Sequence, residues 1–349
     1  MMTQSWPKLI LRLLTCLLAF LLVIVSPLFA ASFGAADISL SQVIAALAHS
    51  LFGLGEVSPL IERIVMDLRF PRILLAIVAG AGLSLAGSVL QTVTRNPLAD
   101  PYLFGISSGA AFGAVVVMSL MGTSFMMAGG SFLSWSHLSL SVGAFIGASL
   151  SILLVLSLSG FGRGNQVERM LLSGVATSFM FGALTSLVLY FSSPQAAASV
   201  LFWSLGSFTK ATWSALILPS AVVLLCGLVF VGLKRQLLAL LAGDETAHTL
   251  GVNVVKLRLG VLLLCSLLTA TLVASCGGIG FVGLMVPHLV RLLLPRSQSL
   301  GLIALVGGLF MLWVDVFARC ILANQELPVG IITAAIGSVF FLVVLRGRR

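Results

Sequence analysis

Long apolar segments separated by short polar loops run through most of the chain. A membrane-spanning helix needs about 20 consecutive apolar residues, and the segments repeatedly reach this length. The pattern predicts ten spans, near residues 10–31, 72–92, 103–121, 138–160, 170–192, 213–233, 258–276, 279–294, 299–320 and 328–345. We therefore predict an all-α, polytopic membrane protein with a single transmembrane domain over residues 1–349.

The number of spans depends on one break, within the apolar stretch 258–294. This stretch is interrupted at residues 276–280, which read CGGIG. Because glycine adopts backbone angles that other residues resist, the cluster predicts two helices and not one. Outside the spans, residues 37–53 carry apolar side chains at helical spacing, which predicts an amphipathic surface helix. A second surface element is predicted over residues 193–212.

Small side chains recur every four residues in three of the predicted spans. In lipid, this spacing lets helix backbones approach closely. The positions are Ala76, Gly80, Ser84 and Ser88, then Gly105, Gly109 and Gly113, and finally Ser139, Gly143, Gly147 and Ser151. We interpret them as packing surfaces without chemistry of their own.

Charge sets the predicted orientation of the chain. Hydrophobic residues make up 59% of the sequence and charged residues 8%, whereas soluble domains carry about 25% charged residues. The net charge of +9 is interpreted as a topology signal and not as nucleic-acid binding, because cytoplasmic loops are enriched in Lys and Arg. With a cytoplasmic N-terminus, the basic residues on the outer side are Arg63, Arg69, Arg72, Lys210 and Arg319. Every other Lys and Arg falls inside, so both termini are predicted to be cytoplasmic.

Nothing in the sequence forms a complete enzyme signature. It lacks a His-Glu-x-x-His zinc motif and a phosphate-binding Gly-x-x-x-x-Gly-Lys-Ser/Thr loop, so the chain is not expected to hydrolyse ATP. The five cysteines form no Cys-x-x-Cys pair and are interpreted as packing residues. Asp315 and Arg319 come closest to mid-span charges. Their four-residue spacing fits a helical ion pair as well as it fits a functional role.

The most polar internal loop covers residues 234–258. It mixes acidic and basic side chains and contains Gly243 and Gly251, at which we expect two short helices to break. A simple connection between two spans does not require such a loop. It therefore predicts a structured cytoplasmic element that contacts a soluble partner.

Another inner loop, residues 95–101 (RNPLADP), joins the second and third spans. Asp100 followed by Pro101 predicts the start of the next helix, with Asp100 as its N-cap. This leaves Asn96 and Leu98 facing the cytoplasm from a rigid turn.

On the outer side, Arg69 and Arg72 lie at the mouth of a span, and Arg319 lies at a similar depth. Their position runs against the positive-inside tendency. Contact with lipid headgroups and recruitment of an acidic partner both remain open as explanations.

Six segments together resemble the permease subunit of ABC importers for ferric siderophores, haem and cobalamin. They are residues 68–72 (LRFPR), 95–101, 105–109 (GISSG), 243–252 (GDETAHTLGV), 278–288 (GIGFVGLMVPH) and 326–330 (ELPVG). The resemblance implies ten spans per subunit in the bacterial inner membrane. It also implies a second permease subunit, expected to be an identical copy, two cytoplasmic ATPases and a periplasmic binding protein. No cofactor is expected on this chain, because ATP and Mg would be bound by the ATPases.

The resemblance also implies roles for individual residues. Those expected to couple to the ATPases are Gly243, Asp244, Glu245, Ala247 and Gly251, with Thr246 departing from the family's Glu-Ala-Ala pattern. Those expected to dock the binding protein are Arg69, Arg72 and Arg319. Those expected to form the cytoplasmic gate are Asn96, Leu98, Val167 and Glu168.

The predicted function is therefore ATP-driven import of a ferric siderophore. Haem and cobalamin are alternative substrates, because nothing in the spans distinguishes between these chelates. An ion-coupled secondary transporter would predict ionisable residues in mid-span. An intramembrane enzyme would predict paired carboxylates, a His cluster or a metal set, none of which the sequence displays.

Overall fold

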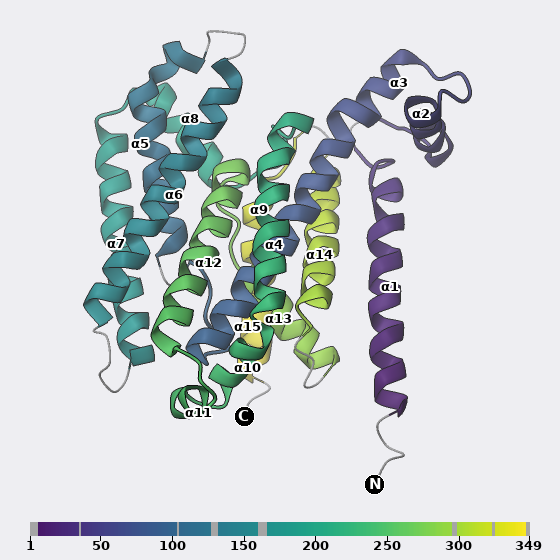
Figure 1. Cartoon of the computed structure of the whole chain (residues 1–349). Helices are drawn as coiled ribbons and strands as arrows, with labels where there is room; N and C mark the ends of the chain where they lie inside the picture. Colours follow the sequence, from purple (N-terminus) through teal and green to yellow (C-terminus); the bar gives the residue numbers. More distant parts are fainter. Residues whose placement is uncertain are drawn as a thin grey trace.

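The computed structural model describes residues 6–34, 36–102, 105–126, 132–159, 166–294, 299–322 and 325–346, and the regular structure in these ranges is helical (Figure 1). The elements are α1 (Trp6–Ala30), α2 (Leu40–Phe52), α3 (Pro59–Arg63), the π-helical segment η1 (Ile64–Arg69), α4 (Phe70–Thr94), α5 (Ile106–Met126), α6 (Phe132–Ser159), α7 (Gln166–Tyr190), α8 (Pro194–Ser204), α9 (Trp213–Gly232), α10 (Lys234–Leu241), α11 (Asp244–Thr249), α12 (Val254–Cys276), α13 (Val282–Leu293), α14 (Leu300–Cys320) and α15 (Val329–Arg346).

Each of the ten predicted spans corresponds to one of these helices. Segments long and apolar enough to cross a membrane are Pro59–Thr94, Val142–Ser159, Leu172–Tyr190, Trp213–Gly232, Val254–Cys276 and Leu300–Cys320. Shorter apolar helices lie within α1, α5, α13 and α15. The all-α, polytopic fold is confirmed. The start of α1 and the end of α15 lie at the end of the bundle that carries α10 and α11 (Figure 1), and the side of the membrane on which this end lies stays a prediction.

Helix α4 lies at the centre of the bundle and packs against α9, α12, α13 and α14. Its backbone approaches two neighbours very closely. A Cβ placed on Gly80 would lie 2.1 Å from the carbonyl oxygen of Gly307 in α14, and one on Gly87 would lie 1.9 Å from that of Gly283 in α13. No larger residue fits at either contact without displacing a helix. The predicted small-residue surface of this span is therefore a true packing surface, and the glycines of α5 and α6 meet in the same way.

The break predicted at the glycine cluster is also confirmed. Helix α12 ends at Cys276 and α13 begins at Val282. Gly277 and Phe281 have φ values of 74° and 68° in the left-handed region. The Ser207 N–H donates to the Cys276 carbonyl at 2.8 Å, which ties the chain after α8 to the break. The break thus places the buried start of α13 beside that segment.

Surface elements follow the predicted ranges. The Ser39 side chain caps α2 by accepting from the Gln42 N–H, and the Gln42 Oε1 accepts from the Ser39 N–H, which forms a reciprocal capping box. Val43 and Ala46 are buried on one side of α2, whereas Ile44 and Leu51 of the predicted apolar face are exposed. The surface helix is confirmed, and its apolar face is buried only in part. Helix α8 occupies the start of the second predicted surface element.

Candidate coupling and gating site

The polar loop folds into two short helices, α10 and α11, at one end of the bundle (Figure 1). Gly243 joins them with a φ of 122°, and Gly251 follows α11 with a φ of 80°. Both angles favour glycine, so the breaks predicted at these two residues are confirmed. Ala247 is fully buried, whereas Glu245 is exposed. Helix α11 therefore packs one face against the protein and presents the other to solvent.

The Asp244 carboxylate joins three segments of the chain. Its Oδ1 accepts hydrogen bonds from Arg95 at 2.7 Å and from Arg258 at 3.1 Å. Arg95 directly follows α4, and Arg258 lies near the start of α12. Asp244 and Arg95 are partly exposed, with side-chain exposures of 39% and 37%, while Arg258 is 11% exposed. One carboxylate at the start of α11 thus connects this helix with both α4 and α12.

Arg95 also begins the loop that carries the first predicted gate residues. It ends α4 in the left-handed conformation, with a φ of 52°. The Asn96 Oδ1 accepts a hydrogen bond from the Leu98 N–H at 2.9 Å, which fixes a local turn. Leu98 is 39% exposed. Asn96 and Leu98 therefore lie directly after an arginine that is held by Asp244.

Asp100 does not cap the next helix, so this prediction was wrong. Helix α5 begins at Ile106, and the Asp100 Oδ1 accepts instead from the Tyr102 N–H, two residues on, at 2.8 Å. Asp side chains stabilise such turns as readily as they cap helices, and the local sequence does not separate the two. Asp100 is 6% exposed. Burial in this loop raises the pKa of its carboxyl to about 6.

A cavity of about 610 Å³ opens beside the gate loop. Its lining includes Leu98, Asp100 and Tyr102 from the loop, Gly280, Phe281 and Leu284 at the start of α13, and Gly330, Ile331 and Ala334 of α15. Leu98 therefore borders a mainly apolar space that extends to α13 and α15. The second predicted gate element, Val167 and Glu168, falls in the first turn of α7, where the side chains lie outside the described residues.

The three arginines predicted on the outer side, Arg69, Arg72 and Arg319, are engaged in contacts within the chain. Arg72 pairs with Asp315 at 2.9 Å and with Glu326 at 2.7 Å. Arg319 pairs with the same Asp315 at 3.2 Å, so the helical ion pair is confirmed. Arg69 donates to backbone carbonyl groups of the segment between α1 and α2. The network connects α4, α14 and the chain that follows α1.

Burial changes the interpretation of these arginines. Arg69, Arg72 and Arg319 are 6%, 9% and 7% exposed. In this chain the three side chains point inward, and neither lipid headgroups nor an outer partner is needed to account for their charge. Buried Asp315 and the backbone carbonyls hold the guanidinium groups inward, because a buried charge without partners is costly. Docking of a binding protein by these residues stays a prediction.

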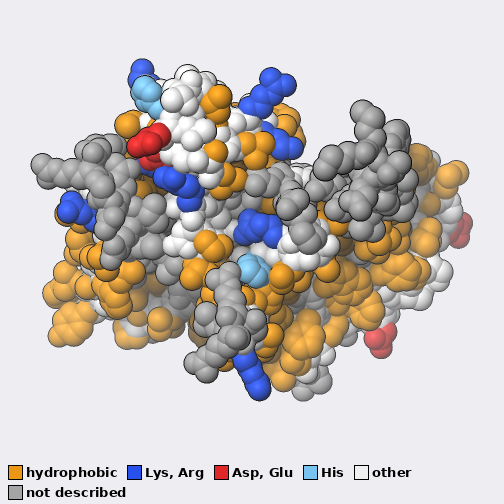
Figure 2. Space-filling view, turned by 90° about the horizontal axis from the view of Figure 1, so that it is seen from below, with side chains coloured by type: hydrophobic (Ala, Val, Ile, Leu, Met, Phe, Trp, Pro, Cys, Tyr) orange, Lys and Arg blue, Asp and Glu red, His pale blue; other side chains and the backbone are white. Residues whose placement is uncertain are grey.

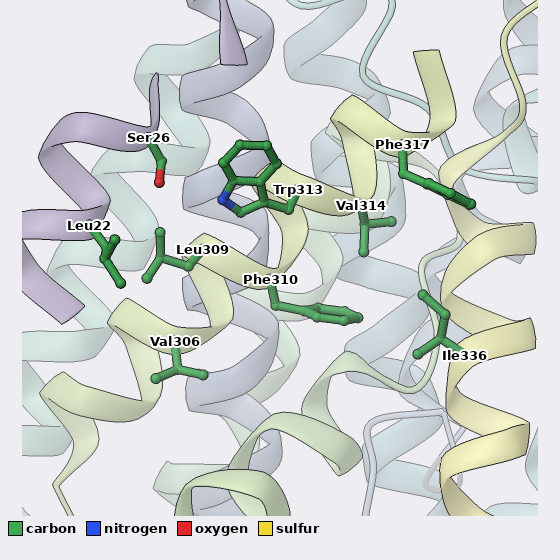
Figure 3. A pocket seen from close by; sticks show the side chains of 9 residues that line it. All are labelled: Leu22, Ser26, Val306, Leu309, Phe310, Trp313, Val314, Phe317 and Ile336. Atoms are coloured by element: carbon green, nitrogen blue, oxygen red, sulfur yellow. The ribbon is translucent and has the colours of Figure 1, made fainter. Parts of the chain in front are cut away.

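Another cavity, of about 450 Å³, lies between α1, α14 and α15. Figure 3 shows Leu22 and Ser26 of α1 on one side and Leu309, Trp313 and other side chains of α14 on the other. Its lining is almost entirely apolar and shares no residue with the gate cavity. It adds no chemistry to the candidate site.

The sequence patterns identify Asp244 but not its two arginine partners. Arg95 and Asp244 are 149 positions apart, and no local motif links them. The one available signal is that all three charges are predicted on the same side of the membrane. Gln91 was also missed: its amide donates to the Gly283 carbonyl at 3.1 Å, and its oxygen accepts from Arg291.

A bundle of apolar helices with a structured polar loop at one end and a loop-lined cavity beside it defines a multi-pass membrane permease. Residues 19–347 match the FecCD transport family, and the chain belongs to this family. It is thus an ABC importer permease, a non-catalytic membrane subunit located in the inner membrane.

Several relatives resemble the chain over most of their length. The hemin transport permease HmuU of Yersinia pestis is 40% identical, covering 81% of this chain and 83% of the relative. The molybdate import permease MolB of Haemophilus influenzae is 32% identical, covering 99% and 97%. A solved structure of an inward-facing metal-chelate type ABC transporter aligns with a TM-score of 0.80 and 31% identity over 95% of this chain and 98% of that one. Other relatives are named for cobalamin and Fe(3+) dicitrate transport.

Proposed function

We propose that this permease imports a ferric siderophore, driven by ATP hydrolysis on partner subunits. The names of relatives support a chelate or oxyanion substrate, since they include hemin, cobalamin, Fe(3+) dicitrate and molybdate. Haem and cobalamin remain the alternative substrates. The relative named for molybdate adds a fourth class, which the sequence motifs did not suggest.

The observation that carries the proposal is the three-way contact of Asp244. An ATPase that binds the exposed face of α11 would displace this short helix. Because Asp244 holds Arg95 and Arg258, the displacement would be passed to the end of α4 and to the start of α12. Gly243 and Gly251 flank α11 with left-handed backbone angles and allow it to sit as a separate unit. In this arrangement the exposed Glu245 would face the ATPase, and the buried Ala247 packs against the protein.

The gate follows from the same contact. Arg95 immediately precedes Asn96 and Leu98, so a shift of Arg95 moves the loop that borders the 610 Å³ cavity. We propose that Asn96 and Leu98 close the cytoplasmic side of the path. Val167 and Glu168 are proposed as a second gate element on the sequence resemblance alone. The mainly apolar lining of the cavity suits a bulky chelate that is released and not tightly bound.

The proposed assembly contains two copies of this chain, two ATPases and a periplasmic binding protein, embedded in membrane lipid. We propose no cofactor on this chain, with ATP and Mg held by the ATPases. Arg69, Arg72 and Arg319 are proposed to support docking of the binding protein indirectly, because they fix the outer ends of α4 and α14. No nucleic acid is involved.

Uptake by the reconstituted complex tests this function. Proteoliposomes containing the permease, its ATPases and its binding protein should accumulate a ferric siderophore only when ATP is supplied on the ATPase side. Haem, cobalamin and molybdate are measured in parallel as competitors. Accumulation of one of these three compounds in preference to ferric siderophore would contradict the proposal that ferric siderophore is the substrate. Uptake that is independent of ATP would contradict the importer mechanism.

The coupling role has its own test in the same vesicles. Glu245→Ala should reduce ATP-driven uptake while leaving assembly of the permease with its ATPases measurable by co-purification. Lys256→Gln is a control of comparable exposure at the start of α12 and should leave uptake unchanged. Equal uptake by Glu245→Ala and wild type would rule out this role for the exposed face of α11.

A further inference from the structure

A third cavity, of about 360 Å³, lies at the end of the bundle that carries α10 and α11, between α4, α10, α13 and α14. Three basic side chains line it: Arg95, Lys234 and Arg291. None of its lining residues, all within the described ranges, is Asp or Glu. Figure 2 shows Lys and Arg side chains spread over this end of the molecule. The cavity is therefore a pocket of one charge sign.

The positive charge of this pocket is poorly neutralised by the chain itself. Arg95 shares a single carboxylate, that of Asp244, with Arg258. Among the ion pairs of the described residues, none includes Lys234 or Arg291. Like charges that line one cavity repel one another. An anion bound between them would relieve this repulsion.

Arg291 is also held in position before any ligand binds. It is half-buried and donates to the Gln91 Oε1. Gln91 is only 4% exposed, and its amide is fixed by the Gly283 carbonyl at 3.1 Å. A guanidinium has five N–H donors, and among the described residues the Arg291 guanidinium donates to Gln91 alone. The other N–H groups of this ordered guanidinium can donate to the oxygens of a phosphate group.

Helix α4 adds the polar side chains Ser88, Gln91 and Thr92 to the lining. An apolar wall is formed by Leu237, Leu238 and Leu241 of α10, and by Leu300 and Ile303 of α14. Leu238 and Leu241 are 40% and 37% exposed, so the apolar wall continues to the molecular surface. A free inorganic anion gains nothing from such a wall, whereas the acyl chains of an amphiphile do.

We propose that this cavity binds the phosphate headgroup of an anionic membrane phospholipid. The basic side chains hold the phosphate, and the leucines of α10 contact the first part of the acyl chains. Basic pockets between membrane helices on the cytoplasmic side are suited to such headgroups. The bound phosphate would compete with Asp244 for Arg95. Binding itself does not depend on the proposed transport function, and only an effect on coupling rests on it.

Binding is tested on the full-length permease in detergent, titrated with short-chain phosphatidylglycerol or phosphatidylcholine and followed by native mass spectrometry. Wild type should retain phosphatidylglycerol in preference to phosphatidylcholine. Lys234→Gln and Arg291→Gln should each weaken phosphatidylglycerol binding by about tenfold, the loss of one charge-assisted contact of about 1.4 kcal/mol. Arg235→Gln is the matched control, because Arg235 is exposed on the same helix and does not line the cavity.

Two outcomes would overturn the proposal. The first is equal phosphatidylglycerol affinity in wild type, Lys234→Gln and Arg291→Gln. The second is displacement of the lipid by inorganic phosphate at the same concentration at which the lipid binds, which would identify a free phosphate as the ligand. Arg291 contacts buried Gln91, so its variant could lose the local fold. The exposed Lys234 variant avoids this difficulty, and an unchanged melting temperature confirms that it is folded.

Discussion

Asp244→Asn should uncouple ATP hydrolysis from transport. The substitution removes the negative charge that binds Arg95 and Arg258 but keeps the shape of the side chain; we call this three-residue contact the Asp244 joint. In the structure, the carboxylate contacts Arg95 at 2.7 Å and Arg258 at 3.1 Å. The Arg95 contact is partly exposed, and exposed ion pairs contribute about 0.2–1 kcal/mol. The Arg258 side is better shielded, and hydrogen bonds to charged groups contribute about 1.5–3 kcal/mol. The Asp244 side chain itself is 39% exposed, so the second value must be reduced for solvent.

The two contacts together give about 1–2 kcal/mol, which corresponds to a factor of about 5–30 in an equilibrium. If movement of α11 reaches the gate through this joint, chelate uptake per ATP hydrolysed should fall by a factor in this range. The rate of ATP hydrolysis should change much less, because the ATP sites lie on other subunits. Both quantities are measured on the same proteoliposomes, with the permease, ATPases and binding protein present.

Asp67→Asn makes the same chemical change as a control. Asp67 is exposed in η1, at the end opposite α11, and no ion pair of the described residues includes it. A double-mutant cycle with Arg95→Gln adds specificity, because the double variant should be hardly worse than either single variant if both act through one contact. If Asp244→Asn takes up as much chelate per ATP hydrolysed as wild type does, the proposal that the Asp244 joint transmits movement of α11 to the gate is refuted.

Three further predictions concern stability, measured as melting temperature in detergent. Asp315→Asn should destabilise the protein by about 3–5 kcal/mol, because it leaves buried Arg319 without its carboxylate and Arg72 with only the partly exposed Glu326. An unchanged melting temperature would refute the network around Asp315. Gly87→Ala should destabilise the protein by about 1–3 kcal/mol, since its Cβ would meet a carbonyl oxygen at 1.9 Å. Gly260→Ala is the control, because a Cβ at Gly260 would have no neighbouring atom within 4 Å. Equal melting temperatures of the two variants would contradict the close packing at Gly87. Burial raises the pKa of Asp100 to about 6, so the folded state binds this proton more tightly than the unfolded state, and stability should fall as pH rises from about 4 to 6. Asp100→Asn should flatten this pH dependence of the melting temperature. Identical pH profiles for the variant and wild type would contradict the prediction.

Periodicity and charge were sufficient to predict the membrane helices. Apolar length sets a span, and glycine sets a break, so both the ten helices and the interruption before α13 follow from local composition. The same holds for α10 and α11, because Gly243 and Gly251 mark their ends and the charges between them have no place in lipid. These features depend on neighbouring residues only.

Contacts between distant segments could not be predicted in this way. The direction of Arg72 and Arg319 depends on Asp315, a buried residue more than 240 positions from Arg72, and the positive-inside rule carries no information about such a partner. The prediction that Asp100 caps the next helix was wrong for a different reason, because a helix cap and a turn can have the same short sequence. In both cases the outcome is decided by which hydrogen-bond partners the tertiary fold supplies.

Helix α4 links the two charged ends of the molecule. Its first turn carries Arg72, which is bound to Asp315 in α14, and its last residue is followed by Arg95, which is bound to Asp244 in α11. Between them, backbone contacts at Gly80 and Gly87 fix α4 against α14 and α13 without a side-chain layer that could slide. A packed interface of this kind transmits displacement and does not absorb it. The pairs of Asp315 with Arg72 and Arg319 are buried, whereas the Asp244–Arg95 contact is partly exposed and borders the gate loop. Movement of α11 would therefore be expressed first at the end of α4 that Arg95 follows.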